Sequence, residues 1–173
     1  MIHSVIKSLI RLIDGVLYGW IGPFSVLYII PQFIMKVAGI PSQSGFGFQG
    51  IKILGMVFMW SGAALAIYCS VLMFMFAKGT PLVTSAPRKL LAKSVYKYSR
   101  NPMMWALFMV VLGEALTFGQ WILFVWLVAM SRIIYLIVVN YEEPQLERRF
   151  GESWKEYCLS VPRWLPGFSK KNQ

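Results

Sequence analysis

Long apolar stretches separated by short polar or basic segments dominate this chain. They run over residues 15–36, 52–76, 103–117 and 120–140. A membrane-spanning helix needs about 20 mainly apolar residues, so the pattern predicts four spanning helices, the third of them short. Pro23 and Pro31 interrupt the first stretch, and Thr117, Phe118 and Gly119 leave room only for a tight turn between the last two.

Amphipathic segments flank the apolar ones. Residues 1–14 place charged residues every three or four positions among apolar ones, which predicts an interfacial helix. They lack the long apolar core of a signal peptide. In the tail, apolar side chains recur every three or four positions, which predicts a cytoplasmic amphipathic helix kinked at Gly151. These tail positions are Leu146, Phe150, Trp154, Tyr157 and Val161.

Composition places the chain in the membrane class, since 57% of the 173 residues are apolar and only 14% are charged. The predicted fold class is all-α: a polytopic membrane helical bundle with about four transmembrane helices, forming one membrane-embedded domain over residues 1–173. The net charge of +10 comes without a nucleic-acid-binding motif, so we expect anionic lipid head groups as partners and no nucleic acid. With His3 as the single histidine, we expect no metal site.

Basic residues fix the expected orientation. They gather in the 77–102 loop and in the tail, while the 117–119 turn has none. The positive-inside tendency then places both basic segments in the cytoplasm, although Lys36 and Lys52 in the outer loop count against it. We expect a multi-pass protein of a prokaryotic inner membrane, or of the endoplasmic reticulum in a eukaryote, with its active site facing the cytoplasm.

Arg100, Asn101 and Pro102 precede the third apolar stretch. Asn101 as N-cap and Pro102 at the first helical position predict a helix start there. Its unpaired amide groups, next to Arg100, make a seat for a carboxylate or phosphate. The alternative is an ordinary helix start with a flanking positive charge.

Glu142 and Glu143 follow the fourth stretch, and Pro144 predicts a helix break after them. Carboxylates at a helix C-terminus oppose the dipole, which a bound cation would offset. Alternatively, they open the tail helix, where acids are favourable. Folding the hairpin brings the pair beside Arg100, and opposed charges at one membrane surface indicate a site for a zwitterionic ligand.

Arg132 lies inside the fourth stretch, roughly 12 Å below Asn140. An ionisable residue at membrane depth is a functional candidate, and the folded hairpin brings it level with Met104. The alternative is a side chain that snorkels to the interface.

Two further patterns surround these motifs. A basic stripe on a helix begun by Pro87 would lie on an anionic membrane or hold an acidic head group; it comprises Lys89, Lys93, Lys97 and Arg100. Aromatic residues are placed to surround a sulfonium or an adenine, although interfacial belts give the same composition. They are Tyr96, Tyr98, Trp105, Tyr135 and Tyr141.

Over residues 77–168 the chain resembles the isoprenylcysteine carboxyl methyltransferase and phospholipid methyltransferase family of integral membrane enzymes. Arg100, Asn101 and Pro102 match its Arg-His/Asn-Pro motif, although Met104 and Ala106 replace the usual tyrosine and glycine and Trp154 replaces the first tail tyrosine. The tail matches at Glu142, Glu143, Pro144, Leu146, Phe150, Gly151, Tyr157, Val161, Pro162, Arg163, Trp164 and Pro166.

The resemblance implies an S-adenosyl-L-methionine-dependent methyltransferase acting on a lipid-like or prenylated substrate, either an isoprenylcysteine carboxylate or a phospholipid amine. It implies cofactor binding by both motifs. From the residues themselves, we expect Tyr98 and Tyr141 to lie beside the cofactor and Arg132, the catalytic candidate, to position the acceptor. Membrane sterol reductases carry a similar tail, so an NADPH-dependent reductase stays open, as does a non-catalytic membrane adaptor.

Overall fold

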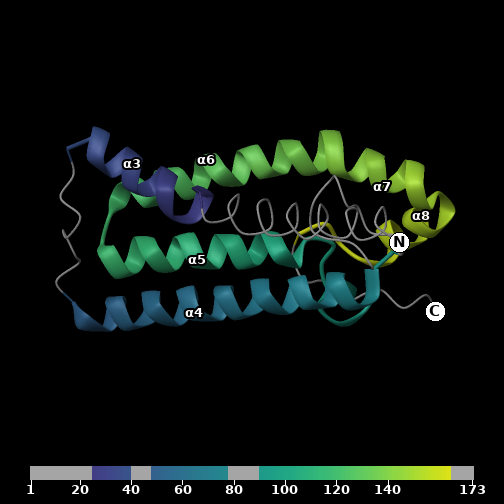
Figure 1. Ribbon diagram of the computed structural model, residues 1–173, viewed down its shortest axis with the longest axis horizontal. Coiled ribbons are helices and arrows are strands. Elements are labelled where there is room, and N and C mark those ends of the chain that lie inside the picture. The colour runs from purple at the N-terminus through teal and green to yellow at the C-terminus, as the bar shows by residue number, and fades with distance from the viewer. Residues whose placement is uncertain (1–24, 40–47, 78–89, 165–173) are drawn as a thin grey trace, which may run out of the picture.

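Helices make up all the regular structure in the part of the chain that the computed structural model describes, residues 25–39, 48–77 and 90–164. The all-α prediction is confirmed. The long helices run side by side in antiparallel order, with shorter helices at both ends (Figure 1). The interfacial helix predicted over 1–14 lies outside the described residues.

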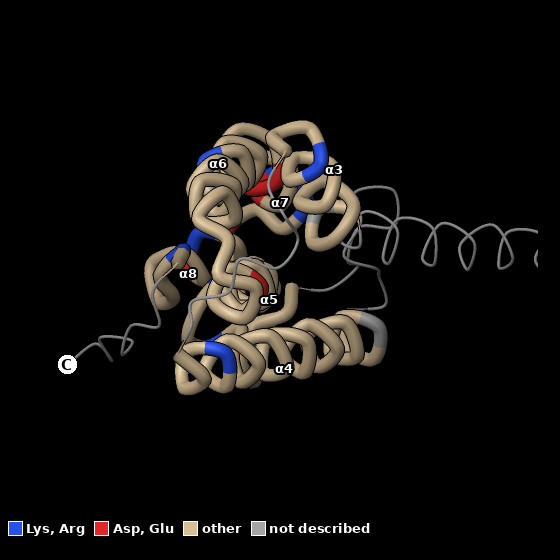
Figure 2. Tube along the Cα trace, turned by 90° about the vertical axis from the view of Figure 1, so that its left-hand side faces the viewer, with Lys and Arg blue, Asp and Glu red and all other residues tan. Residues whose placement is uncertain are grey.

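Among the described residues, two helices are long and apolar enough to cross a membrane. One is α4 (Gln49–Leu72), which continues as the π-helical η3 (Met73–Ala77). The other spans Trp121–Phe150 and consists of α6 (Trp121–Ile137), the π-helical η6 (Val138–Glu142) and α7 (Glu143–Phe150). Figure 2 shows that charged residues are sparse along the long helices.

Two shorter apolar helices accompany them. The third predicted span is α5 (Pro102–Phe118). The first is described only from Ser25, as the π-helical η2 (Ser25–Ile29) followed by α3 (Ile30–Val37). Pro31 sits in the first turn of α3 and does not interrupt it. Four membrane crossings therefore remain a prediction.

The α5–α6 hairpin forms as predicted. Pro102 is the first residue of α5, and Gly119 ends that helix in the left-handed conformation, with φ 63°, which glycine adopts without a Cβ penalty. Gln120 precedes α6. The hairpin returns the chain to the level at which α5 began, so the segments on either side of it meet at one end of the molecule.

Glycines let α4 and α5 approach until their backbones touch. A Cβ placed on Gly113 would lie 2.5 Å from the Met59 nitrogen, and one on Gly62 would lie 2.8 Å from the Ala106 oxygen. A Cβ on Gly55 would lie 2.6 Å from the Thr117 nitrogen. Small residues at such contacts are typical of helices that associate in membranes. We call this contact the glycine seam.

The basic helix predicted from Pro87 to Arg100 is wrong over its described part. Lys93 is extended, and the only helical turn between residues 90 and 100 is the 3₁₀-helical η5 (Ser94–Lys97). Ser94 has φ 53°, which a continuous helix excludes. Burial of Tyr96 against Cys69, Leu72 and Leu91 explains the departure, because that packing sets the path of this segment.

The break predicted at Pro144 is also wrong. The helix passes through it, because the chain widens into η6 just before the proline and the Glu143 N–H bonds to Val138 O, five residues back. Pro144 then lies in the first turn of α7, where a missing N–H costs little.

The tail helix forms in two pieces. Gly151, with φ 54° and ψ −126°, separates α7 from α8 (Glu152–Ser160). The predicted apolar positions share one cluster, in which Trp154, Tyr157 and Val161 are buried and Leu146 and Phe150 pack against them. The predicted kink is thus a full helix end.

We predict that Gly113→Ala destabilises the protein. The added methyl group would force the α4 and α5 backbones apart, and overpacking of this kind costs about 1–3 kcal/mol. Gly50→Ala is the control, since a Cβ there meets only the flexible ring of Phe48. Thermal unfolding in detergent measures both, and equal unfolding temperatures for the two variants would contradict the seam.

Candidate functional site

Glu143 is the centre of the polar cluster at the feet of the α5–α6 hairpin. Its Oε1 accepts a hydrogen bond from Arg100 Nη1 at 3.0 Å. Arg163 donates to both carboxylate oxygens, from Nε at 2.8 Å and from Nη2 at 2.7 Å. The side chains of Arg100 and Glu143 are 12% and 15% exposed, and that of Arg163 is 31% exposed. A largely buried carboxylate is thus compensated by two guanidinium groups.

Residues 161–164, which follow α8, cross the start of α5 and are called here the tail strap. Their carbonyl oxygens accept three hydrogen bonds from residues at the start of α5. Arg100 N donates to Pro162 O at 3.0 Å, Asn101 Nδ2 to Arg163 O at 3.0 Å, and Trp105 Nε1 to Trp164 O at 2.6 Å. Ser99 Oγ adds a bond to Trp164 O at 2.9 Å.

The strap changes the expected role of Asn101. The residue stands at the N-cap position, but its side chain does not cap α5 and donates to the strap instead. The predicted side-chain cap is therefore wrong, because a better-placed acceptor lies across the helix start. The backbone amides just before α5 are also used by the chain itself, since Arg100 N donates to Pro162 O and Asn101 N donates to Ser99 Oγ.

Arg100 is enclosed on its other sides by α8. Its Nη1 donates to Cys158 Sγ at 2.9 Å, and its guanidinium lies over the Trp154 ring, 5.9 Å from the centroid. Tyr157 fixes the preceding loop by donating to Tyr96 O at 2.6 Å. Arg100 Nε is buried and has no hydrogen-bond partner in the described structure.

Glu142 lies beside this cluster and differs from its neighbour. Its side chain is half-buried. Among the described residues, no hydrogen bond or ion pair reaches its carboxylate. The end of the hairpin therefore offers both a buried donor, Arg100 Nε, and an unpaired carboxylate.

The surroundings also set the protonation states of the tail. The hydrogen bond to Glu143 raises the pKa of Arg163, which therefore stays charged. Burial raises the pKa of the Cys158 thiol, and the nearby Arg100 only partly opposes this. Burial likewise raises the pKa of the Tyr157 phenol. At neutral pH the thiol and phenol are neutral beside charged arginines.

The remaining predicted site residues lie around the cluster rather than in it. Tyr98 and Tyr141 are 58% and 50% exposed. Arg132 is exposed on α6, with its guanidinium 5.5 Å from the Tyr135 ring centroid. That ring stacks on Trp164 of the strap at 6.3 Å, so Arg132 is linked to the cluster through two aromatic rings.

Arg163 and Cys158 are the site residues that the sequence analysis did not single out as ligands. In the sequence, Arg163 stands out only as part of the tail motif. Its signal is the Val-Pro-Arg-Trp sequence after an amphipathic helix, where proline ends the helix and directs the next residues back to the bundle. No sequence pattern points to Cys158, because its contact with Arg100 depends on how α8 packs.

The family of this chain follows from its match to a protein-family model. A family model described as phospholipid methyltransferase matches residues 51–153. The chain belongs to this family. The matched region contains Arg100, Asn101, Pro102, Glu142 and Glu143 and ends before the tail strap. No curated protein and no solved structure matches the chain.

The geometry of this phospholipid methyltransferase family member predicts a structural role for Glu143. Glu143→Gln would leave two arginines without a counter-ion. Breaking a buried pair costs about 3–5 kcal/mol, and we expect somewhat less because Arg163 reaches solvent. Unfolding in detergent measures the loss.

The control for this prediction is Glu152→Gln. It removes the partner of Lys155 from an ion pair in which the side chains are 54% and 80% exposed. Such surface pairs contribute at most about 1 kcal/mol. If the two variants unfold alike, Glu143 does not hold this end of the bundle together.

Proposed function

We propose that this chain is an integral membrane methyltransferase that uses S-adenosyl-L-methionine and acts on a lipid-like substrate, an isoprenylcysteine carboxylate or a phospholipid amine. Family membership supports the methyltransferase class. The observation that carries the cofactor assignment is that two groups stand at the same end of the hairpin: a buried, unsatisfied Arg100 Nε and a Glu142 carboxylate that has no partner among the described residues. The amino-acid part of S-adenosyl-L-methionine has one carboxylate and one ammonium, which match these two groups.

The residues fit this ligand with distinct roles. Arg100 Nε would donate to its carboxylate, since a buried donor gains a full hydrogen bond when an acceptor arrives. Glu142 would accept from its ammonium. Glu143 is already shared by two arginines, so in this proposal it holds Arg100 in place. The exposed rings of Tyr98 and Tyr141 offer faces for the adenine or the sulfonium.

S-adenosyl-L-methionine supplies an electrophilic methyl group on its sulfonium. The chain contributes positioning: Arg100 and Glu142 would fix the amino-acid part of the ligand, while Asn101 and Pro102 shape the start of α5 beside it. Holding two reactants in line at near-attack distance removes much of the entropic barrier.

Arg132 is proposed to position the acceptor. It is exposed on an apolar helix, and a lone charge at membrane depth is costly unless a partner meets it. The carboxylate or phosphate of a lipid-like acceptor would be such a partner. The stacking of Tyr135 on Trp164 places this arginine near the strap that covers the start of α5.

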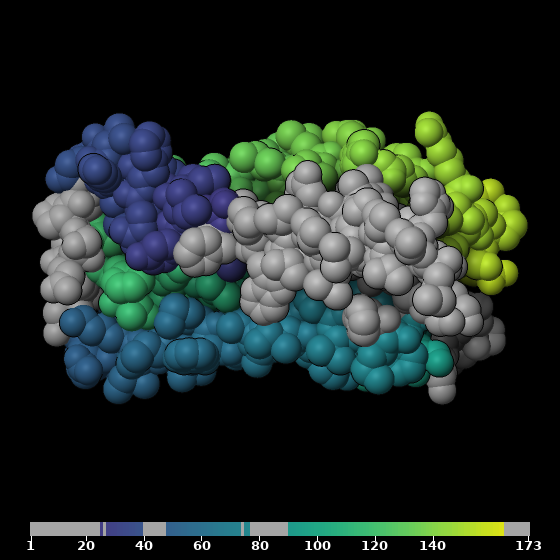
Figure 3. Space-filling view, viewed as in Figure 1, coloured from purple at the N-terminus to yellow at the C-terminus, as the bar shows by residue number. Residues whose placement is uncertain are grey.

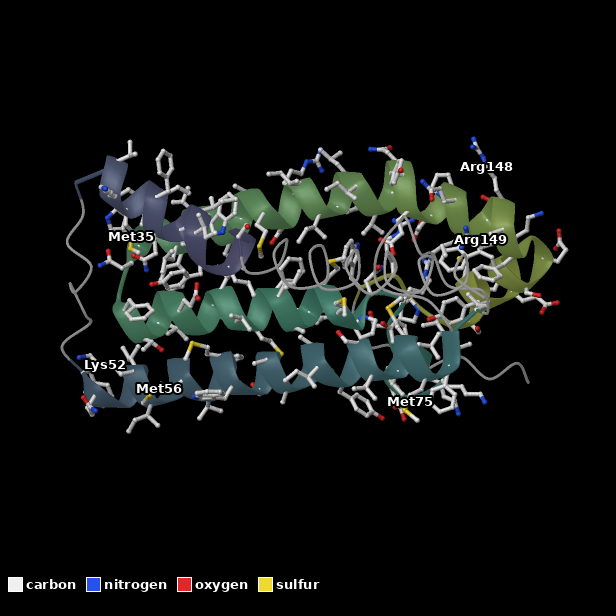
Figure 4. The ribbon with its side chains drawn as sticks, in the orientation of Figure 1. Met35, Lys52, Met56, Met75, Arg148 and Arg149 are labelled. Carbon is white, nitrogen blue, oxygen red and sulfur yellow. The ribbon has the colours of Figure 1, made fainter. Side chains whose placement is uncertain are left out.

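Four spans with the hairpin feet in the cytoplasm complete the proposal, with a prokaryotic inner membrane or the endoplasmic reticulum as the compartment. Figure 4 shows Arg148 and Arg149 at the end of the molecule opposite to Lys52. Arg100 and Arg163 lie in the cluster near α7 and α8. The basic end is the one that the positive-inside tendency assigns to the cytoplasm.

An NADPH-dependent reductase is the less favoured alternative. It relied on a basic helix to hold the 2′-phosphate, and that helix is not formed over its described part. A non-catalytic adaptor would bind neither NADPH nor the methyl donor.

Titration calorimetry of the purified protein tests the cofactor. We expect S-adenosylhomocysteine to bind and NADPH not to bind. Glu142→Gln should weaken S-adenosylhomocysteine binding about ten- to a hundredfold, the loss of one charge-assisted hydrogen bond, at an unchanged unfolding temperature. Glu147→Gln, an exposed change on α7, is the control. NADPH binding, or unchanged S-adenosylhomocysteine affinity in Glu142→Gln, would refute the assignment.

Arg132→Gln tests the acceptor role. We expect radiolabelled methyl transfer to membrane lipid or prenylated peptide to fall at least tenfold while S-adenosylhomocysteine affinity stays constant. Arg132→Lys should restore only part of it, since an ammonium cannot copy the two-pronged contact of a guanidinium. Full transfer in Arg132→Gln would show that Arg132 only snorkels to the interface.

A further inference from the structure

A cavity of about 180 Å³ lies between η2, α3, α4, α5 and α6, at the other end of the molecule from the Glu143 cluster. Most of its lining is apolar and includes Leu27, Pro31, Met35, Met59 and Leu123. Figure 4 labels Met35 at this end, and Figure 3 shows η2 and α3 beside the end of α5. The cavity is large enough for a small organic group, since an engineered apolar cavity of roughly 150 Å³ holds benzene.

Glu114 is the polar feature of this cavity that the proposed function leaves unused. It is the one ionisable residue of α5, it is partly buried, and it lines the cavity. No hydrogen bond or ion pair from the described residues reaches its carboxyl group. An unpaired carboxylate among apolar side chains is unfavourable. A positively charged ligand that compensates this charge would therefore bind more favourably than its apolar contacts alone allow.

The lining defines the chemistry of that guest. A single carboxylate repels anions, and the described residues hold no group of three or more His, Cys, Asp or Glu side chains suited to a metal ion. Tyr28 and Phe118 also line the cavity, and both are exposed at its edge, by 52% and 40%. Aromatic faces next to a carboxylate favour an organic cation, and the apolar walls favour a short carbon chain attached to it.

We propose that this cavity binds an alkylammonium group, with Glu114 as its counter-ion. The group belongs either to a free alkylamine or to a lipid head group with a primary amine. The site lies at the opposite end of α5 from Arg100 and does not depend on the proposed methyl transfer. Gln32 lines the cavity as well and offers its amide oxygen as a second acceptor.

The test uses hexylammonium chloride as the probe and 1-hexanol as its uncharged counterpart, on the full chain in detergent at neutral pH. We expect hexylammonium to raise the unfolding temperature saturably, as a ligand of the folded state does, and hexanol to bind at least tenfold more weakly. Glu114→Gln should reduce hexylammonium affinity at least tenfold. Glu147→Gln removes the same charge outside the cavity and should behave as the unaltered protein.

Met59→Trp provides a second variant, which fills the cavity and keeps the carboxylate. It should also abolish binding, as measured by calorimetry. Equal affinity for hexanol and hexylammonium, or full hexylammonium affinity in Glu114→Gln or in Met59→Trp, would overturn the site.

Lipid discs distinguish the two sources of the group. In discs of choline lipid alone, hexylammonium should bind as it does in detergent. If ethanolamine lipid in the disc lowers that affinity only when Glu114 is present, the lipid amine is the occupant. If it does not, the occupant is a free amine.

Discussion

One carboxylate, that of Glu143, joins three distant parts of the chain. Arg100 comes from the residue pair before α5, Glu143 from the start of α7, and Arg163 from the tail strap. Two charges removed from water are rarely stabilising unless the remaining hydrogen-bonding capacity is used. Here both carboxylate oxygens accept guanidinium donors. The arrangement of this end of the bundle, and with it the placement of Glu142 and of the buried Arg100 Nε, depends on that shared group.

The parts of the fold that sequence patterns predict are those set by local backbone chemistry. Pro102 begins α5, Gly119 ends it, and Gly151 separates the tail helices, in each case because the residue type restricts or frees its own dihedral angles. The meeting of Arg100 and Glu143 follows from the same logic, since a tight hairpin returns the chain to its starting level.

What the patterns miss depends on main-chain groups and on long-range packing. The tail strap binds α5 through three backbone carbonyl oxygens. Because every residue type has such an oxygen, no pattern of side chains in the sequence predicts this contact. The helix expected from Pro87 does not form over its described part, because the burial of Tyr96 sets a different path for the chain. Pro144 does not break its helix, because a π-helical turn two residues earlier accommodates it. The burial of Tyr96 is a tertiary contact that overrides a local preference, whereas Pro144 is accommodated within its own helix.

The glycine seam restricts how a lipid can reach the protein interior. Where Gly55, Gly62 and Gly113 bring the two backbones into contact, there is no space for an acyl or prenyl chain to pass between α4 and α5. Side entry from the bilayer is therefore closed on that flank over most of the length of α5. Under the proposed function, a lipid-like acceptor would therefore approach from the side of α6, where Arg132 and Tyr135 lie near the strap.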